Sequence, residues 1–464
     1  MQALAITVLP LLAPFGYWLG LGVAIICAIV ARNKRHGHGL LKKSMGRGDS
    51  LLLALLLGVG VVELAVGVWH SSLNKAMPLA SAAWLAALAF VIIRSVPPRP
   101  SAWWFGLALS GLGTGGWAAW QKWVVGLTRA TGHPPLHSIF FGNLSLLVAF
   151  LCLAGLGWAW QQRSARFFWV ALLLSGAMGG GLASALSGTR GGWLALPLVI
   201  WVFYCGYARR WRAIWRWLAL IALIAVMIGA YATPYSGVEK RVDKAVAEVH
   251  RYTESTDYGS VGARLEMYRG AIRLIYERPF VGYGHQGYLP AMQRLEAQGV
   301  LSPELGNYWH AHNDLLDAWV RRGLPGLLMV VSLYLIPLWL FFPGLRSESS
   351  LQRSYAVAGM LLPIAFMSFG LSYSFFAYPA GVAVYASWLI FLWIHVSDQV
   401  PQNGCHVYTN EKPDGDTADA NVTDGSHFYN WVVNSKAGSA SPWWQHNDVG
   451  NALATAGGLG TRGR

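Results

Sequence analysis

The sequence predicts an all-α protein, a polytopic bundle of transmembrane helices with one large extramembrane helical loop. Of its 464 residues, 55% are hydrophobic and only 12% are charged, whereas soluble domains carry about 25% charged residues. Apolar runs of about 16 to 24 residues, long enough to cross a bilayer, repeat along the chain between short basic links. One long polar stretch, residues 233–324, interrupts this pattern and is too long to be a simple connector.

The first apolar run, residues 3–31, contains Pro10, Pro14 and Gly16, which break it near its first third. It is either one kinked span or a hairpin of two. We favour the hairpin, which gives about twelve spans rather than about eleven. The other spans are expected at residues 50–69, 78–93, 102–120, 138–160, 167–186, 193–208, 217–232, 325–342, 354–371 and 381–397.

The distribution of basic residues predicts the orientation of the chain. Residues 32–47 form the densest basic loop, which the positive-inside rule places in the cytoplasm. Counting spans from there, the loops on the inner side contain Arg94, Arg99, Arg163, Arg166, Arg209, Arg210, Arg212, Arg216, Arg346 and Arg353. The short outer loops around residues 70–77, 187–192 and 372–380 contain only Lys75 and Arg190. The 233–324 loop is therefore expected outside.

Four regions follow from this map: N-terminal spans (1–232), the outer loop (233–324), C-terminal spans (325–397) and a tail (398–464). The tail is rich in Asn, Gly, Asp, Ser and Thr without a helical period, which predicts a disordered cytoplasmic segment. The net charge of +14 is spread over loops, a placement that favours membrane lipids over nucleic acid as partners. The four cysteines show neither metal-site nor disulfide spacing.

Apolar residues in the outer loop recur with a helical period, at Leu265, Tyr268, Ala271, Ile272 and Ile275. We expect a helix that Ser260 and Gly262 open, with Arg264 in its first turn. A cation there is unfavourable for the helix dipole but suits an approaching anion. Arg264 and Arg269 are therefore candidate anion contacts. The alternative is a solvated face, which suits Arg273 and Arg278 better.

Arg190 is the only charged residue in the short outer loop Ser187-Gly-Thr-Arg-Gly-Gly-Trp193. Glycines leave backbone N–H groups open, and an arginine beside such a turn makes an anion site. The alternative is an arginine that reaches lipid headgroups.

The segment His310-Ala-His312-Asn313-Asp314 precedes an amphipathic run. A neutral histidine at the membrane surface, with a pKa near its ordinary value of about 6.5, suits a general base. A zinc pair lacks a convincing third ligand, and a histidine that caps the helix is the structural alternative. We expect the two histidines to point in opposite directions. Asp314 and Asp317 could orient an imidazole or simply favour the helix start.

Together these motifs resemble the bacterial O-antigen ligase family. They are Ser-Gly-Thr-Arg190-Gly-Gly, Gly-Ala-Arg264-Leu-Glu-Met-Tyr, Arg278-Pro-Phe-Val-Gly-Tyr-Gly284, His310-Ala-His312-Asn313-Asp-Leu-Leu and Gly323-Leu-Pro-Gly326. The resemblance covers about residues 1–397 and leaves out the tail. O-antigen polymerases and some protein oligosaccharyltransferases share this architecture and are the alternatives within the same class of enzyme.

The resemblance implies a glycosyltransferase of the bacterial inner membrane whose outer loop and active site face the periplasm. Its donor would be a glycan on undecaprenyl diphosphate, and its acceptor a sugar of lipid A–core. Arg190 and Arg264 would hold the diphosphate and His312 would activate the acceptor hydroxyl. Arg269, His310 and Asn313 are further candidates for substrate binding.

Neither a metal nor another cofactor is expected. Related membrane glycosyltransferases hold a divalent ion with an acidic residue in the first outer loop, but residues 70–78 contain no carboxylate and Glu63 lies within the preceding span. Arginines would take the place of the metal. A transporter for the same lipid-linked glycan is the rival class, although it would not need a histidine in a large outer loop.

Overall fold

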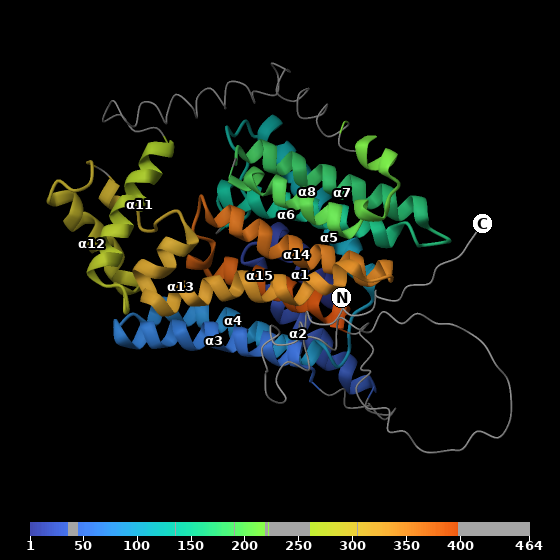
Figure 1. Ribbon diagram of the computed structural model, residues 1–464, viewed down its shortest axis with the longest axis horizontal. Coiled ribbons are helices and arrows are strands. Elements are labelled where there is room, and N and C mark those ends of the chain that lie inside the picture. The colour runs from blue at the N-terminus through green and yellow to red at the C-terminus, as the bar shows by residue number, and fades with distance from the viewer. Residues whose placement is uncertain are drawn as a thin grey trace, which may run out of the picture. The chain divides into compact units, whose positions relative to one another are not determined.

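The computed structural model describes residues 1–35, 45–134, 136–189, 191–218, 221, 260–303 and 305–397 (Figure 1). Within these ranges all regular structure is helical. Seven described helices are long and apolar enough to cross a membrane. The all-α membrane architecture is therefore confirmed. The described residues leave out the tail, residues 36–44 of the basic 32–47 loop, most of the expected 217–232 span and the start of the outer loop. The number of spans therefore stays a prediction.

Most expected spans coincide with helices. The long helices are α2 (Gly16–Arg35), α3 (Arg47–Trp69), α4 (Leu73–Ile93), α5 (Pro100–Trp123), α6 (Ser138–Ala159), α7 (Arg166–Ser187), α13 (Asp314–Phe341), α14 (Ser350–Gly370) and α15 (Pro379–Ser397). The shorter ones are α1 (Gln2–Leu12), α8 (Leu196–Gly206), α11 (Ser260–Glu277) and α12 (Gly284–Ala297). Single turns lie at η1 (Gly191–Ala195), η2 (Ala208–Arg210), η4 (Leu305–Asn307), η5 (Phe342–Arg346) and η6 (Phe375–Ala377).

The first apolar run forms two helices that pack on each other, as the hairpin interpretation predicts. Helix α1 ends at Leu12 and α2 begins at Gly16. A Cβ atom on Gly16 would lie 1.7 Å from the carbonyl oxygen of Leu9, and one on Gly20 would lie 2.6 Å from that of Ala5. The two glycines therefore let the antiparallel helices approach closely.

The buried helices α14 and α15 lie at the centre of the bundle (Figure 1). Helices α3 and α4 pack as a pair on one side, where α3 contacts α13 and α4 contacts α15. Helices α5, α6, α7 and α8 form the other side. Burial of apolar side chains against these central helices supplies the main packing surface of the bundle.

Helix α13 is longer than the expected span and has a bend. The expected amphipathic run and the 325–342 span form one element, Asp314–Phe341, so the last residues of the expected outer loop, 314–324, are helical. The bend is at Gly323, whose φ of 65° and ψ of −162° are not helical. A Cβ atom there would lie 2.1 Å from the carbonyl oxygen of Phe280, so this position needs glycine.

The bend of α13 joins two of the sequence motifs. The backbone N–H of Leu324 donates to Pro279 O at 2.9 Å, and the N–H of Tyr283 donates to Val320 O at 2.9 Å. The Arg278–Gly284 motif thus fastens the turn between α11 and α12 to the bent helix, and its role here is structural.

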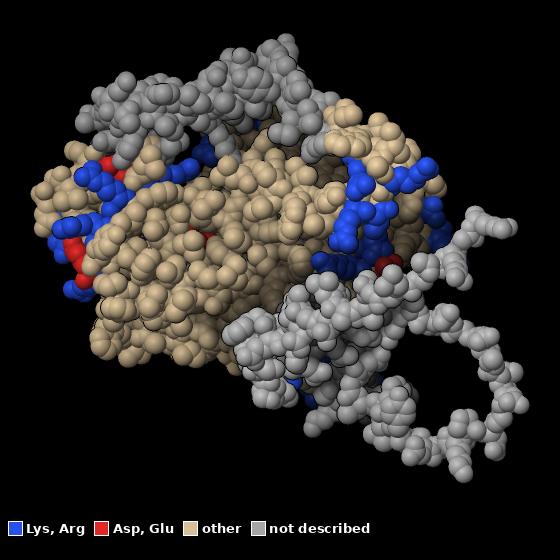
Figure 2. All heavy atoms as spheres, viewed as in Figure 1, with Lys and Arg blue, Asp and Glu red and all other residues tan. Residues whose placement is uncertain are grey.

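The expected outer loops lie together at one end of the bundle. His70 contacts the carbonyl oxygen of Val281 at 3.0 Å through Nε2, and Arg129 donates to Ser187 O at 2.9 Å. Phe376 N–H donates to Asp314 Oδ1 at 2.9 Å. On the face shown in Figure 2, lysines and arginines gather toward two opposite ends, with uncharged surface between them. This pattern is typical of a membrane-embedded belt between two aqueous sides.

Candidate functional site

The start of α13 is fixed by two side chains. The Asn313 Oδ1 atom accepts hydrogen bonds from the N–H groups of Leu315 and Leu316, at 3.0 and 3.1 Å, and caps the helix. The buried Asp314 accepts from Phe376 N–H and, at 3.1 Å, from the Tyr334 hydroxyl. The helix start is thereby held against the segment that precedes α15.

His310 and His312 lie side by side, with ring centroids 4.1 Å apart. The expectation that they point in opposite directions is wrong. Successive side chains alternate along an extended chain, so residues two apart lie on the same side, and the expectation misapplied this rule. The chain also departs from an extended conformation at His312, whose φ is 51°. The backbone N–H of His312 donates to Nδ1 of His310 at 3.3 Å. The two imidazoles therefore form one cluster.

Both imidazoles are neutral near pH 7. Burial, reinforced by the neighbouring His312, lowers the pKa of His310 to about 3. Burial and then the positive charge of Arg264 lower the pKa of His312 to about 4, while a hydrogen bond with the Ser372 backbone acts in the opposite direction. The expected pKa of about 6.5 is therefore wrong for His312. Its Nδ1 is buried and has no hydrogen-bond partner among the described residues.

The Asp317–Arg321 ion pair fixes the backbone of the histidine segment. Asp317 Oδ1 accepts from Arg321 Nε at 3.0 Å and from the backbone N–H of Ala311 at 3.0 Å. Arg321 also donates to Trp309 O and, at 3.0 Å, to His285 O. Both side chains are almost fully buried. Asp317 thus contacts the backbone between the two histidines and orients the segment through it.

Arg264 and Tyr268 of helix α11 face the histidine cluster. They are four residues apart and so lie on one face of the helix. The Tyr268 hydroxyl donates to Leu371 O at 2.6 Å and contacts His312 O at 3.3 Å. Helix α11 begins at Ser260, so Arg264 follows the first turn. No ion pair joins Arg264 to a carboxylate among the described residues.

A chain of polar aromatic residues lies on the other side of the histidines. His137 Nδ1 accepts from Ile139 N–H at 3.2 Å and its Nε2 contacts the Tyr373 hydroxyl, which in turn donates to Tyr378 at 2.9 Å. Tyr373 lies 4.7 Å from His310 and 5.5 Å from His312 between ring centroids. Burial and then Arg129 lower the pKa of His137, so this imidazole is also neutral.

Arg190 lies outside the described residues, but its neighbours reach the same region. Thr189 Oγ1 donates to Ser138 O at 3.0 Å, next to His137. A Cβ atom on Gly191 would lie 1.9 Å from Ser372 Oγ, and Ser372 is the residue whose backbone meets His312. The loop before η1 is thus adjacent to the histidine cluster.

Arg269, in contrast, lies on the exposed face of α11. Its side chain is 63% exposed and pairs with Glu266 at 3.5 Å. Arg273 is 65% exposed and lies 3.9 Å from Glu277, and Arg278 stacks over Tyr283. The last two arginines fit the solvated face expected for them.

A buried ion pair anchors this end of α13 to the membrane helices. Arg322 Nε donates to Glu63 Oε1 at 2.7 Å, and Glu63 Oε2 lies 2.9 Å from His285 Nε2. Glu63 is fully buried in α3. This carboxylate therefore joins α3, α12 and α13. Across the described parts of the chain, no group of three His, Cys, Asp or Glu side chains converges as in a metal site.

Comparison with known proteins agrees with these motifs. The model of a family described as O-antigen ligase matches residues 176–331. This chain resembles the O-antigen ligase family. The resemblance drawn from the sequence motifs is confirmed, and the matched range includes the Arg264 and His312 motifs and ends within α13.

Two curated relatives are similar to this chain. An uncharacterized protein of Haemophilus influenzae is 28% identical over 305 residues, which are 64% of this chain and 74% of the relative. An O-antigen ligase of Escherichia coli K12 is 28% identical over 120 residues, 25% of this chain and 27% of that protein. The family match supports a membrane-embedded transferase of glycans in general terms.

Several residues of the site were not singled out from sequence. Arg129, His137, Tyr373 and Tyr378 lie in two loops far apart in the chain, and Arg321 lies within a run that reads as an ordinary helix. A basic residue and two histidines in the 124–137 loop, on the same side as His312, are the one sequence signal that points to this part of the site.

Proposed function

We propose that this protein is an O-antigen ligase of the bacterial inner membrane, with its active site on the periplasmic face. It transfers a glycan from undecaprenyl diphosphate to a hydroxyl of lipid A–core. The observation that carries the proposal is the neutral His312, with an unpartnered Nδ1, beside Arg264, which has no described ion pair. A buried nitrogen and a guanidinium that both lack a partner among the described residues suit a substrate that brings a hydroxyl and an anion.

In the proposed reaction, Nδ1 of His312 accepts the proton of the acceptor hydroxyl. The hydroxyl oxygen forms a bond to the anomeric carbon of the donor sugar, and the bond from that carbon to the diphosphate oxygen breaks. Negative charge grows on the leaving diphosphate, where Arg264 and Arg190 stabilise it. A low pKa makes His312 a weak base, but one that is fully unprotonated at neutral pH. Arg269 at the rim and His310 beside the base remain proposed substrate contacts, and the Asn313 amide nitrogen could add another.

Purified protein, supplied with undecaprenyl-diphosphate-linked glycan and lipid A–core, tests the proposal. We expect ligated lipopolysaccharide as the product, and a loss of about 100- to 10,000-fold in His312→Ala with donor binding retained. His310→Ala should lose less, since it contacts His312 rather than the reacting atoms. A lengthened lipid-linked polymer as the product would identify a polymerase instead. A glycosylated protein would identify an oligosaccharyltransferase. Donor that crosses the membrane without being cleaved would identify a transporter. Full activity of His312→Ala would remove this residue as the base.

A further inference from the structure

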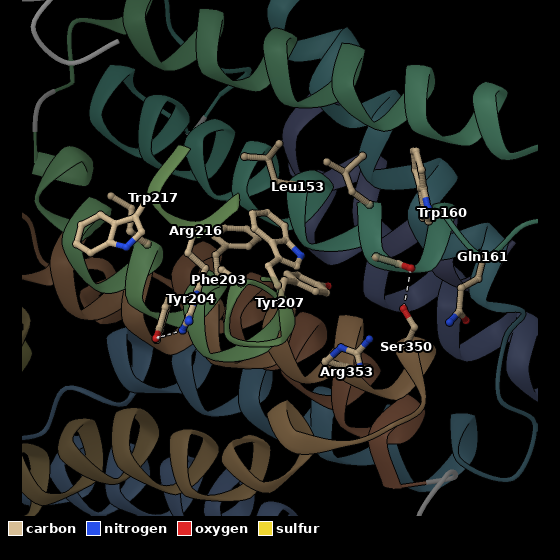
Figure 3. A pocket seen from close by; sticks show the side chains of 15 residues that line it. Leu153, Trp160, Gln161, Phe203, Tyr204, Tyr207, Arg216, Trp217, Ser350 and Arg353 are labelled. Carbon is tan, nitrogen blue, oxygen red and sulfur yellow. Dashed lines mark hydrogen bonds between the residues drawn. The ribbon is translucent and has the colours of Figure 1, made fainter. Parts of the chain in front are cut away.

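A second candidate binding site lies at the other end of the bundle. It is a cavity of about 1070 Å³ between the C-terminal end of α6, helix α8 with the segment after it, and the N-terminal end of α14 (Figure 3). Helix α6 is 22 residues long, so at about 1.5 Å per residue its two ends are roughly 33 Å apart. His137 caps one end of α6 and Trp160 caps the other, which separates this cavity from the histidine site by about the thickness of a bilayer.

The lining of the cavity is aromatic and cationic. Six aromatic side chains line it: Trp160, Phe203, Tyr204, Tyr207, Trp211 and Trp217. Its charged lining residues among those described are two arginines, Arg216 and Arg353, and none of these lining residues is a carboxylate. An apolar cavity with a few polar groups on one side is the usual form of a site for an amphipathic ligand.

Neither arginine is neutralised within the described part of the chain. Arg216 contacts the Tyr204 hydroxyl at 3.5 Å. Arg353 donates to Ser347 O at 2.6 Å through Nη1, while its Nε is buried without a hydrogen-bond partner. The nearby Glu348 pairs with Arg210 at 2.7 Å and is 90% exposed. Arg353 also contacts the backbone oxygen of Glu348 at 3.4 Å. Since no described carboxylate forms an ion pair with either arginine, the cavity offers donors and positive charge to an anionic ligand.

The walls of the cavity are fixed rather than loosely packed. The Tyr207 hydroxyl donates to Ala154 O at 2.6 Å and contacts Ser354 Oγ at 3.0 Å, and Ser350 Oγ donates to Gly157 O at 2.7 Å. These bonds join α6, α8 and α14 around the cavity, and Figure 3 shows the one that Ser350 donates. Trp160, Trp211 and Trp217 are largely exposed, as is usual for tryptophans at the level of lipid headgroups.

We propose that this cavity binds an anionic phospholipid, with the phosphate at Arg216 and Arg353 and an acyl chain between the aromatic side chains. Charge complementarity favours an anionic headgroup over a zwitterionic one, and the apolar lining favours a lipid over a soluble phosphate. The site is independent of the proposed transferase activity, so each can fail without the other.

Native mass spectrometry of the full-length protein, exchanged from detergent into phosphatidylglycerol or phosphatidylcholine at equal concentrations, tests this site. The wild-type protein should retain phosphatidylglycerol at least about tenfold better, since each arginine near a membrane surface contributes a several-fold gain for an anionic lipid. The Arg216→Gln/Arg353→Gln variant should lose about 10- to 30-fold of that retention. Ile200→Trp, which fills the cavity without a change in charge, should reduce retention of both lipids.

The Arg163→Gln/Arg209→Gln variant is the matched control, because both residues are exposed at the same end and outside the cavity. It should keep the wild-type preference, and thermal unfolding should show that all variants are folded. Equal retention of the two lipids, an equal loss in the control, or displacement by millimolar glycerol phosphate would each overturn the proposal.

Discussion

Asp317 and Ala311 are joined by a hydrogen bond of 3.0 Å from the Ala311 N–H to the Asp317 carboxylate. The same oxygen accepts a hydrogen bond from Arg321, which also donates to the Trp309 carbonyl oxygen. The turn that carries both histidines is therefore fixed by a buried ion pair on the helix that follows it. This contact makes the geometry of His312 depend on residues that do not touch its ring.

The first prediction concerns this positioning contact. Asp317→Ala leaves Arg321 buried without its partner, and the loss of one partner of a buried pair costs about 3–5 kcal/mol. We expect a lower melting temperature and a fall in kcat with little change in the KM for donor. Asp317→Glu should recover part of the stability but less of kcat, because the longer side chain displaces the Ala311 N–H contact. Full kcat in a folded Asp317→Ala protein would contradict the positioning role.

The second prediction concerns the arginines that face the site. Arg264→Ala should lower transfer about 30- to 1000-fold, equal to about 2–4 kcal/mol for a lost contact to a developing anion. Arg190→Ala should lower transfer by a similar factor. If the contact is bidentate, lysine at either position should restore little of the transfer rate. Transfer from the lipid-linked donor measures the effect.

Arg273→Ala is the control for this series, since Arg273 lies on the same helix and is 65% exposed. It should change transfer by less than about twofold, as is usual for an exposed position. Near-normal transfer by both Arg264→Ala and Arg190→Ala would leave these arginines as contacts to lipid headgroups.

The third prediction is a dependence on pH. The folded pKa values of His310 and His312 are about 3 and about 4, below the ordinary 6.5. Between about pH 4 and 6.5 the unfolded chain therefore binds protons that the folded protein does not, and the free energy of unfolding falls as the pH is lowered through this window. Melting temperatures from pH 7.5 to 5 should decline, and less so in His310→Gln. An unchanged decline in the His310→Gln/His312→Gln double variant would exclude these two residues as its source.

The pKa of His312 also predicts the pH at which activity falls on the acidic side. If His312 accepts the proton, kcat/KM should stay level down to about pH 5 and fall only below that, with an apparent pKa well under 6.5. Initial rates in a series of buffers at constant ionic strength measure this limb.

The fourth prediction concerns topology. In a variant without native cysteines, a membrane-impermeant maleimide should label Ser302→Cys but not Ser44→Cys in intact spheroplasts. The first position lies in the loop between α12 and α13 and the second in the basic 32–47 segment, which the positive-inside rule places on opposite sides. The reverse labelling would invert the whole orientation.

The fifth prediction concerns metal. Arginines take the place of a divalent ion in the proposed reaction, and Glu63, the carboxylate nearest to the first outer loop in sequence, is buried and bonded to Arg322 and His285. EDTA should therefore change the rate of the purified transferase by less than about twofold. Strong inhibition by EDTA that a divalent cation reverses would exclude the mechanism without metal.

The sequence by itself determined the helical membrane architecture, because apolar runs of spanning length and the breaks at Pro10 to Gly16 and around Gly188 depend on local composition. It also marked Arg264 and the histidine pair, whose residue types are unusual at the edge of an apolar run. The resemblance to the O-antigen ligase family rests on these same local motifs.

The tertiary structure decided what surrounds those residues. His310 and His312 lie side by side, and the positive φ at His312 is a local turn that the expected extended segment does not contain. Their low pKa values come from burial by Tyr373 and neighbouring side chains that lie about sixty residues away in sequence. The links from Glu63 to Arg322 and from His137 to Tyr373 likewise join distant segments. Burial and long-range pairing depend on how helices meet in space, and a single sequence does not specify those contacts.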